Sequence, residues 1–243
     1  MDRKITWLKV DWRYALRELV LIVAGILIAI ALNSWWNSKV DYEQETQYLS
    51  GIETDIENSI AELNATINFH EQQVKDLRKL FGIVHAEPSQ ARKDSLLELS
   101  HALIFNSTFE PELATYDEML ASGNLNLLES ERIRNALTLY QYQLQNNNDF
   151  NNYLEQQSSL TIEPFFMENL AYHPLKGLDE PYRPPDIDLT ALYTDLHFHN
   201  LILLRLDTEA NVLEIRKRLL ETMHDVQRYI KEELVQRGVS DGE

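Results

Sequence analysis

The stretch that decides the fold is Leu19-Val-Leu-Ile-Val-Ala-Gly-Ile-Leu-Ile-Ala-Ile-Ala-Leu32, an unbroken apolar run close to the N-terminus. With its flanking residues it extends over 15–36, about 20 residues, which matches a hydrocarbon core of about 30 Å. Trp35 and Trp36 follow the run, where an aromatic belt forms at a membrane–water interface. Arg17 precedes it and can extend its charged end to the opposite interface. The sequence therefore predicts one transmembrane helix, with Arg17, Trp35 and Trp36 as interface anchors.

Charge predicts the orientation of this helix. Residues 1–14 form a basic tail, and basic residues flanking a span are retained in the cytoplasm. We therefore expect a single-pass protein of the cell inner membrane with a cytoplasmic N-terminus and a periplasmic or extracellular C-terminal domain. A cleaved secretory signal is the alternative, because Ala29-Ile-Ala31 fits the small-x-small cleavage pattern. Since no helix breaker precedes that site, the sequence favours the retained anchor.

The composition limits the partners. The chain carries a formal net charge of −17, and its soluble part is more acidic than its N-terminal tail. Such a surface repels nucleic acid and anionic lipid, so we expect neither as a partner. The sequence has no cysteine, so no disulfide stabilises the domain and its stability must come from its core.

Two long helices frame the soluble domain, which we place at residues 40–238. The first, about 41–83, has apolar residues recurring every three or four positions, which is typical of a helical seam: Leu49, Ile52, Ile56, Ile60, Leu63, Ile67, His70, Val74, Leu77 and Phe81. The second, about 195–237, has a similar stripe and ends at Gly238: Leu201, Leu204, Leu206, Val212, Ile215, Leu219, Met223, Val226 and Ile230. Two helices of matched length most simply pair antiparallel. No alternating strand pattern is present, so the predicted fold is an all-α antiparallel bundle.

Shorter helices are expected between them, over about 93–172. One begins at Pro111 and ends at Ser122-Gly123, and another has Ser130 as its N-cap. Residues 141–152 are rich in asparagine and glutamine, and we expect them to continue that helix as a largely solvated stretch. Residues 173–188 contain four prolines and form a loop that is a candidate binding surface.

The segment Ala15-Leu-Arg-Glu-Leu-Val-Leu-Ile-Val-Ala-Gly-Ile-Leu-Ile-Ala, with Asn33-Ser-Trp35, resembles the opening of an uncharacterised family of single-pass bacterial membrane proteins. The segment Thr115-Tyr-Asp-Glu-Met-Leu-Ala-Ser-Gly-Asn-Leu-Asn-Leu-Leu128 is similar to a second part of that family, whose function is unknown. Trp36 departs from the polar residue usual at that position. The resemblance implies a helical envelope protein and supplies no catalytic residue.

Two Glu-x-x-His pairs, Glu98 with His101 and Glu221 with His224, have the spacing of di-iron bundles. Random sequence of this composition produces such pairs about as often, and the second pair lies beside the apolar stripe rather than within it. We therefore predict no metal site.

The other histidines fit structural roles. His197 and His199 follow Asp195 at a helix start and point about 200° apart on a helix, which does not suit a shared metal. His70 occupies a seam position, where a hydrogen-bonded core histidine or a register-setting polar residue is a better interpretation than a ligand.

Within the span, Gly25, Ala29 and Asn33 form a ridge of small and polar side chains. Such ridges allow close helix packing in lipid. The ridge indicates self-association or docking to a partner span, and an ordinary lipid-facing helix is the alternative.

The expected function is that of a membrane-anchored, extracytoplasmic interaction or scaffold protein, with no catalytic residue and no cofactor. Its partners would be the membrane and either a second copy or a partner membrane protein. The first alternative is a ligand-sensing bundle with a pocket near Tyr116, Tyr140 and the proline-rich loop. The second is a di-metal carboxylate enzyme built on the Glu-x-x-His pairs.

Overall fold

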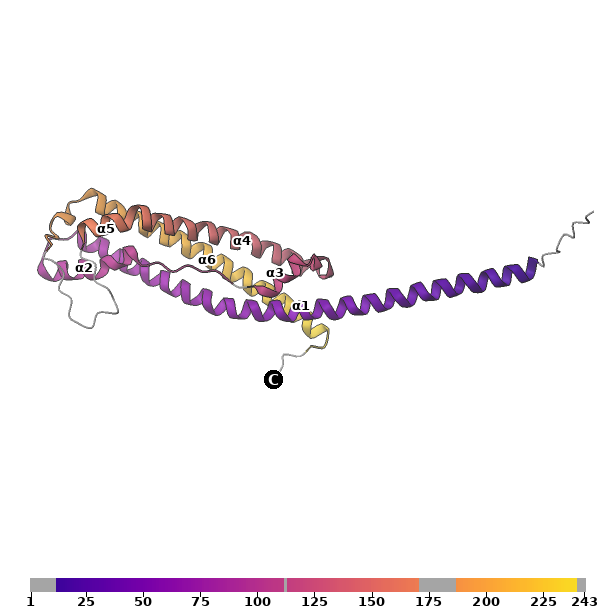
Figure 1. The fold of residues 1–243 in the computed structure, drawn as a ribbon. Coiled ribbons are helices and arrows are strands. Elements are labelled where there is room, and N and C mark those ends of the chain that lie inside the picture. Colours follow the sequence, from indigo (N-terminus) through magenta and orange to yellow (C-terminus); the bar gives the residue numbers. More distant parts are fainter. Residues whose placement is uncertain (1–11, 112, 171–186, 240–243) are drawn as a thin grey trace, which may run out of the picture.

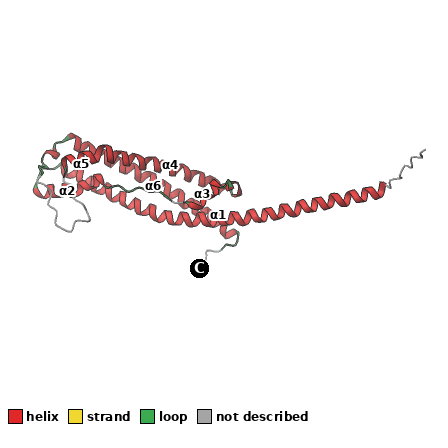
Figure 2. Ribbon diagram, in the orientation of Figure 1, coloured by secondary structure: helices red, strands yellow, loops and turns green. Residues whose placement is uncertain are grey.

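The computed structural model describes residues 12–111, 113–170 and 187–239, and Figure 1 shows their arrangement. One helix, α1 (Trp12–Val84), runs from the N-terminal apolar run to the far end of the domain. Figure 2 shows helices and loops only, and no strand occurs among the described residues. The all-α prediction is confirmed.

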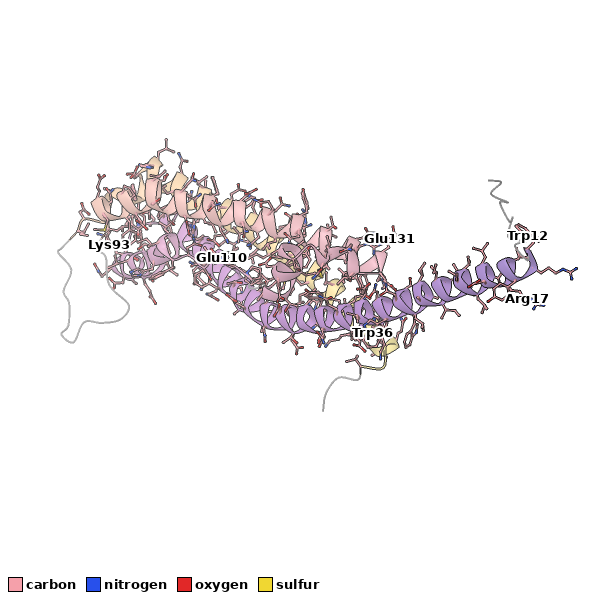
Figure 3. All side chains as sticks on the ribbon, turned by 45° about the vertical axis from the view of Figure 1, so that its right-hand side comes forward. Trp12, Arg17, Trp36, Lys93, Glu110 and Glu131 are labelled. Carbon is pink, nitrogen blue, oxygen red and sulfur yellow. The ribbon has the colours of Figure 1, made fainter. Side chains whose placement is uncertain are left out.

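The first part of α1 lies outside the bundle. Figure 3 shows Trp12 and Arg17 on this projecting arm, with Trp36 nearer the bundle. The apolar run is exposed on all sides, and α1 is long and apolar enough there to cross a membrane. The predicted span and the predicted first seam helix are therefore parts of one helix without a break. We call the end of the bundle nearer this arm proximal and the other end distal.

The last helix, α6 (Leu196–Gln236), lies antiparallel to α1. Asp195 caps its start by accepting a hydrogen bond from the backbone N–H of His197. Gly238, with φ of 76°, follows its end in the left-handed conformation that glycine adopts readily. Ion pairs fix the register between the helices, because residues late in α6 contact residues early in the bundle part of α1: Arg237 with Glu45, Lys231 with Glu53 and Lys217 with Glu71.

Shorter elements connect these two helices: α2 (Gln90–Ile104), α3 (Ala114–Ala121), the 3-10 turn η1 (Asn124–Leu127), α4 (Glu131–Gln157), the π-helical turn η2 (Ser158–Ile162), α5 (Glu163–Asn169) and the 3-10 turn η3 (Ala191–Tyr193). Ser130 caps α4, as predicted. Pro111 does not begin a helix, contrary to the prediction, since α3 begins at Ala114. Most of the proline-rich loop 173–188 lies outside the described residues.

Helix α4 is continuous through its asparagine-rich middle and runs antiparallel to α6. The prediction that this stretch is largely solvated is wrong for two of its side chains. Asn147 and Asn151 are buried, because they face the interior of the bundle at a level where it contains polar groups.

The apolar core is divided along the bundle. A proximal cluster lies around Leu49, Ile56 and Met223, and a distal cluster lies around Leu77, Phe166 and Phe198. Between them is a layer of buried polar side chains from α1, α4 and α6: His70, Asn147, Asn151, Arg205, Glu209 and Arg216. This layer is the most unusual feature of the domain.

Candidate functional site: an extended segment beside a buried polar layer

A stretch of non-helical backbone, residues 105–111, occupies one corner of the bundle between α2 and α3. We call it the extended segment. It runs along the bundle beside α1 (Figure 1), and Phe105 has an extended backbone, with φ of −68° and ψ of 135°. Gln73 of α1 contacts its first residue and Asp55 of α1 contacts Thr115 just beyond it. The two contacts on α1 are about 27 Å apart along the helix axis. About ten residues cover this distance only if most of them are nearly extended, since a fully extended chain advances about 3.3 Å per residue.

The extended segment is held by its carbonyl groups. Three of them, at alternate positions, each accept two side-chain hydrogen bonds of 2.8–3.0 Å from the surrounding helices: Phe105 from Gln73 and Arg205, Ser107 from His70 and Arg216, and Phe109 from Asn147 and Asn151. Buried carbonyl groups without a partner are costly, and the polar layer supplies the donors that a helix would have supplied internally.

His70 links this segment to a buried carboxylate. Its Nε2 lies 2.8 Å from the Ser107 carbonyl oxygen, which can only accept, so Nε2 carries a proton. Its Nδ1 is hydrogen-bonded to Glu209 Oε2, and both side chains are fully buried. His70 is therefore the hydrogen-bonded core histidine that its seam position predicted.

Two arginines make the layer cationic. Arg205 Nη2 lies 2.8 Å from Glu209 Oε1, and Arg216 donates to Asn151 over 3.1 Å. Burial lowers the pKa of Arg216 to about 10, because desolvation disfavours its charged form more than the negative charge of Glu209 favours it. Burial also lowers the pKa of Arg205, against the same opposing interaction. At neutral pH Arg216 remains charged, so its burial disfavours folding throughout the range below about pH 10, and the penalty is relieved as the pH rises further.

A groove lies beside the extended segment. An extended backbone is thinner than a helix, which leaves space where a fourth helix would otherwise pack. This groove has a volume of about 300 Å³, and the segment and α4 line it: Glu110, Pro111, Leu144, Asn148, Asn151 and Asn152.

The proximal end of the bundle is closed by a second buried ion pair. Glu45 Oε2 accepts from Arg237 Nη2 over 2.6 Å, and Glu45 Oε1 accepts from the backbone N–H of Glu129 over 2.8 Å. Burial acts to lower the pKa of Arg237, but hydrogen bonds to Glu45 and Glu233 outweigh it, so the pKa is raised. These contacts join the end of α6 and the start of α4 to α1 where it leaves the bundle.

The predicted membrane residues all lie on the projecting arm of α1. Gly25, Ala29 and Asn33 are exposed, and a Cβ at Gly25 would meet nothing within 4 Å. Trp35 and Trp36 are also exposed. The single chain provides no packing partner for this ridge in its described part.

The described residues bring together no group of three or more side chains able to hold a metal. The Glu-x-x-His pairs lie apart, since α2 packs on the distal core whereas Glu221 and His224 are exposed on the proximal half of α6. Tyr116 and Tyr140, near which the ligand-sensing alternative placed a pocket, are packed into the proximal core at 4% and 0% exposure.

The polar layer was not predicted from the sequence. Its signal was nevertheless present, because Arg205, Glu209 and Arg216 continue the helical spacing of Leu201, Val212 and Leu219. Leu204 was placed on the stripe instead, and it is exposed.

The fold and the site define a class: a helical bundle whose first helix extends into a candidate membrane span. The chain belongs to a family of unknown function, DUF6090, whose sequence profile matches residues 18–171. The match begins within the projecting arm, includes the extended segment and α4, and ends just after α5. No curated protein and no solved structure matches the chain.

Proposed function

We propose that this protein is a membrane-anchored, non-catalytic interaction module of the bacterial envelope, with its N-terminus in the cytoplasm and its bundle on the outer side of the inner membrane. The observation that carries the proposal is the continuity of α1, which joins the apolar run to the distal end of the bundle in one helix. A single helix holds the domain at a fixed distance and direction from its anchor.

The length of α1 favours a rigid support over a flexible tether. From Trp36 to Glu45, where the bundle begins, α1 advances about 13 Å, so the domain stands close to the membrane surface. From residue 37 to Val84 it advances about 70 Å. The Glu45–Arg237 pair fixes the point at which the arm leaves the bundle.

Cysteine labelling tests the orientation, because the natural chain has no cysteine. We expect Glu57→Cys, on an exposed site of α1, to react with a membrane-impermeant maleimide in cells whose outer barrier has been opened. Arg3→Cys should react only after the inner membrane is disrupted. The opposite labelling pattern, or recovery of the intact chain in the soluble fraction, contradicts the proposal.

Self-association through the span is part of this proposal, with Gly25, Ala29 and Asn33 as the packing ridge. The mass of the detergent-solubilised protein should fall to that of a monomer in Gly25→Leu, since the added side chain prevents close approach. Gly82→Leu, at another open helical glycine in the bundle part of α1, is the control and should not change the mass. Equal monomeric masses for the natural chain and Gly25→Leu exclude span-driven association.

A further inference from the structure

We propose that the outer edge of the extended segment is a binding site for an extended peptide of a partner protein, which adds to it as a β-strand. This inference deepens the proposed function, because it names the surface and the kind of partner that the interaction module uses. It rests on a separate observation, the hydrogen bonding of the segment.

The backbone carbonyls on one edge of the segment are hydrogen-bonded to side chains, whereas the backbone groups on the other edge are unpaired in the described chain. In an extended backbone the N–H and C=O groups of successive residues point to opposite edges. The carbonyls of Phe105, Ser107 and Phe109 face the helices and are all bonded. The intervening residues turn their backbone groups the other way, and in the described chain those of Asn106, Thr108 and Glu110 have no hydrogen-bond partner. A row of unpaired backbone groups is what a further strand binds.

The surroundings of this edge fit a peptide better than a second copy of the chain. Asn106 and Thr108 are partly exposed and Glu110 is exposed. Each copy carries a formal net charge of −17, so pairing two copies brings like charges together, whereas a basic peptide is attracted. A single extended peptide needs only the width of one strand beside the segment. The groove adjoins Glu110 and Pro111, so it can receive side chains from that end of the peptide.

The chemistry of the groove indicates the peptide's composition. Asn148 and Asn152 offer amide groups to polar side chains, and Leu144 offers a small apolar contact. Glu110 is exposed and belongs to a strongly acidic protein, which favours a Lys or Arg in the part of the peptide beside it. Pro111 has no N–H and ends the usable edge.

The test uses the full chain in lipid nanodiscs and a displayed library of short random peptides. We expect the selection to yield binders, measured as synthetic peptides by fluorescence anisotropy. Backbone N-methylation of a binder should weaken binding about tenfold at every second residue and leave it unchanged at the residues between, since only alternate amides face the edge. Failure to select any peptide, or an N-methylation profile without this alternation, overturns the proposal.

A host variant provides an independent measurement. Thr108→Pro removes the outward N–H and keeps the inward carbonyls, and it should weaken peptide binding about tenfold or more. Thr108→Ala is the matched control and should bind normally.

Equal binding of the peptide to the natural chain and to folded Thr108→Pro contradicts the site. If that variant does not fold, the N-methylation profile on the natural chain decides. A dimer of the natural chain that Thr108→Pro abolishes would overturn the choice of occupant. Orientation is measured separately, so loss of peptide binding with the expected maleimide labelling rejects this inference alone.

Discussion

At the scale of single residues, Gly51 shows how one absent side chain sets a helix contact. It lies in the seam helix, and a Cβ there would come within 2.6 Å of Thr115 Cγ2 and 2.7 Å of Thr115 Oγ1. Asp55, one turn further along α1, accepts a hydrogen bond from the Thr115 backbone N–H over 2.9 Å. The glycine therefore allows the start of α3 to lie directly on α1.

We expect Gly51→Ala to lower the free energy of unfolding by about 1–3 kcal/mol, because the new methyl group overpacks this contact. In a Thr115→Ala background the same change should cost less, since Thr115 Cγ2 and Oγ1 are gone and only the Cβ at position 115, 3.1 Å away, stays close, while alanine is the better helix former. Urea unfolding of the four proteins, followed by circular dichroism, measures both effects. An equal loss of stability in both backgrounds contradicts the contact.

Glu209 is the residue on which the charge of the buried layer depends. It is fully buried, pairs with Arg205 and interacts with Arg216. We expect Glu209→Gln to destabilise the protein by about 3 kcal/mol or more, because it leaves two buried cations without their negative partner. Glu214→Gln, on the same helix and in an exposed pair with Arg218, is the control and should change stability by less than about 1 kcal/mol. Thermal unfolding at constant pH measures both variants, and equal effects contradict this role for Glu209.

At the scale of elements, the extended segment depends on side chains from other helices for its backbone hydrogen bonds. Asn147 and Asn151 both donate to the Phe109 carbonyl. Each single alanine variant should therefore lower stability by about 1–3 kcal/mol. The double variant should differ from the sum of the two, because they share one acceptor and both contact Arg216.

Asn152→Ala is the control for this pair, since the same residue type is exposed one position further along α4. It should have an effect within about 0.5 kcal/mol, as is usual for surface positions. Strict additivity of the Asn147 and Asn151 changes, measured by urea unfolding, contradicts a shared role in holding the segment.

At the scale of the whole molecule, the proposed role as a rigid support depends on the length of α1. Lys39 lies just beyond the apolar run and Lys79 near the distal end, and both side chains are more than half exposed. Spin labels on cysteines at these two positions should give a single narrow distance distribution centred near 60 Å, the rise of 40 helical residues. Pulsed electron–electron double resonance on the protein in nanodiscs measures this distance distribution. A broad or much shorter distribution shows that the helix bends or breaks.

The prediction of the helical framework succeeded where local pattern and packing agree. The seam from Leu49 to Leu77 and the stop at Gly238 follow from spacing and from glycine chemistry. The start of α3 was misplaced because proline favours a first helical turn, whereas Pro111 belongs to the extended segment. The extended conformation of that segment depends on hydrogen-bond donors from three helices, and these donors cannot be predicted from the local sequence.

The sequence by itself determined the all-α class, the apolar arm and the two long helices, because hydrophobic periodicity acts within a few turns of one chain segment. Only the tertiary structure decided that residues 105–111 stay extended and that Arg205, Glu209 and Arg216 turn inward. Those outcomes have one physical reason: a buried backbone carbonyl needs a donor, and here the donors come from positions up to 109 residues away along the chain.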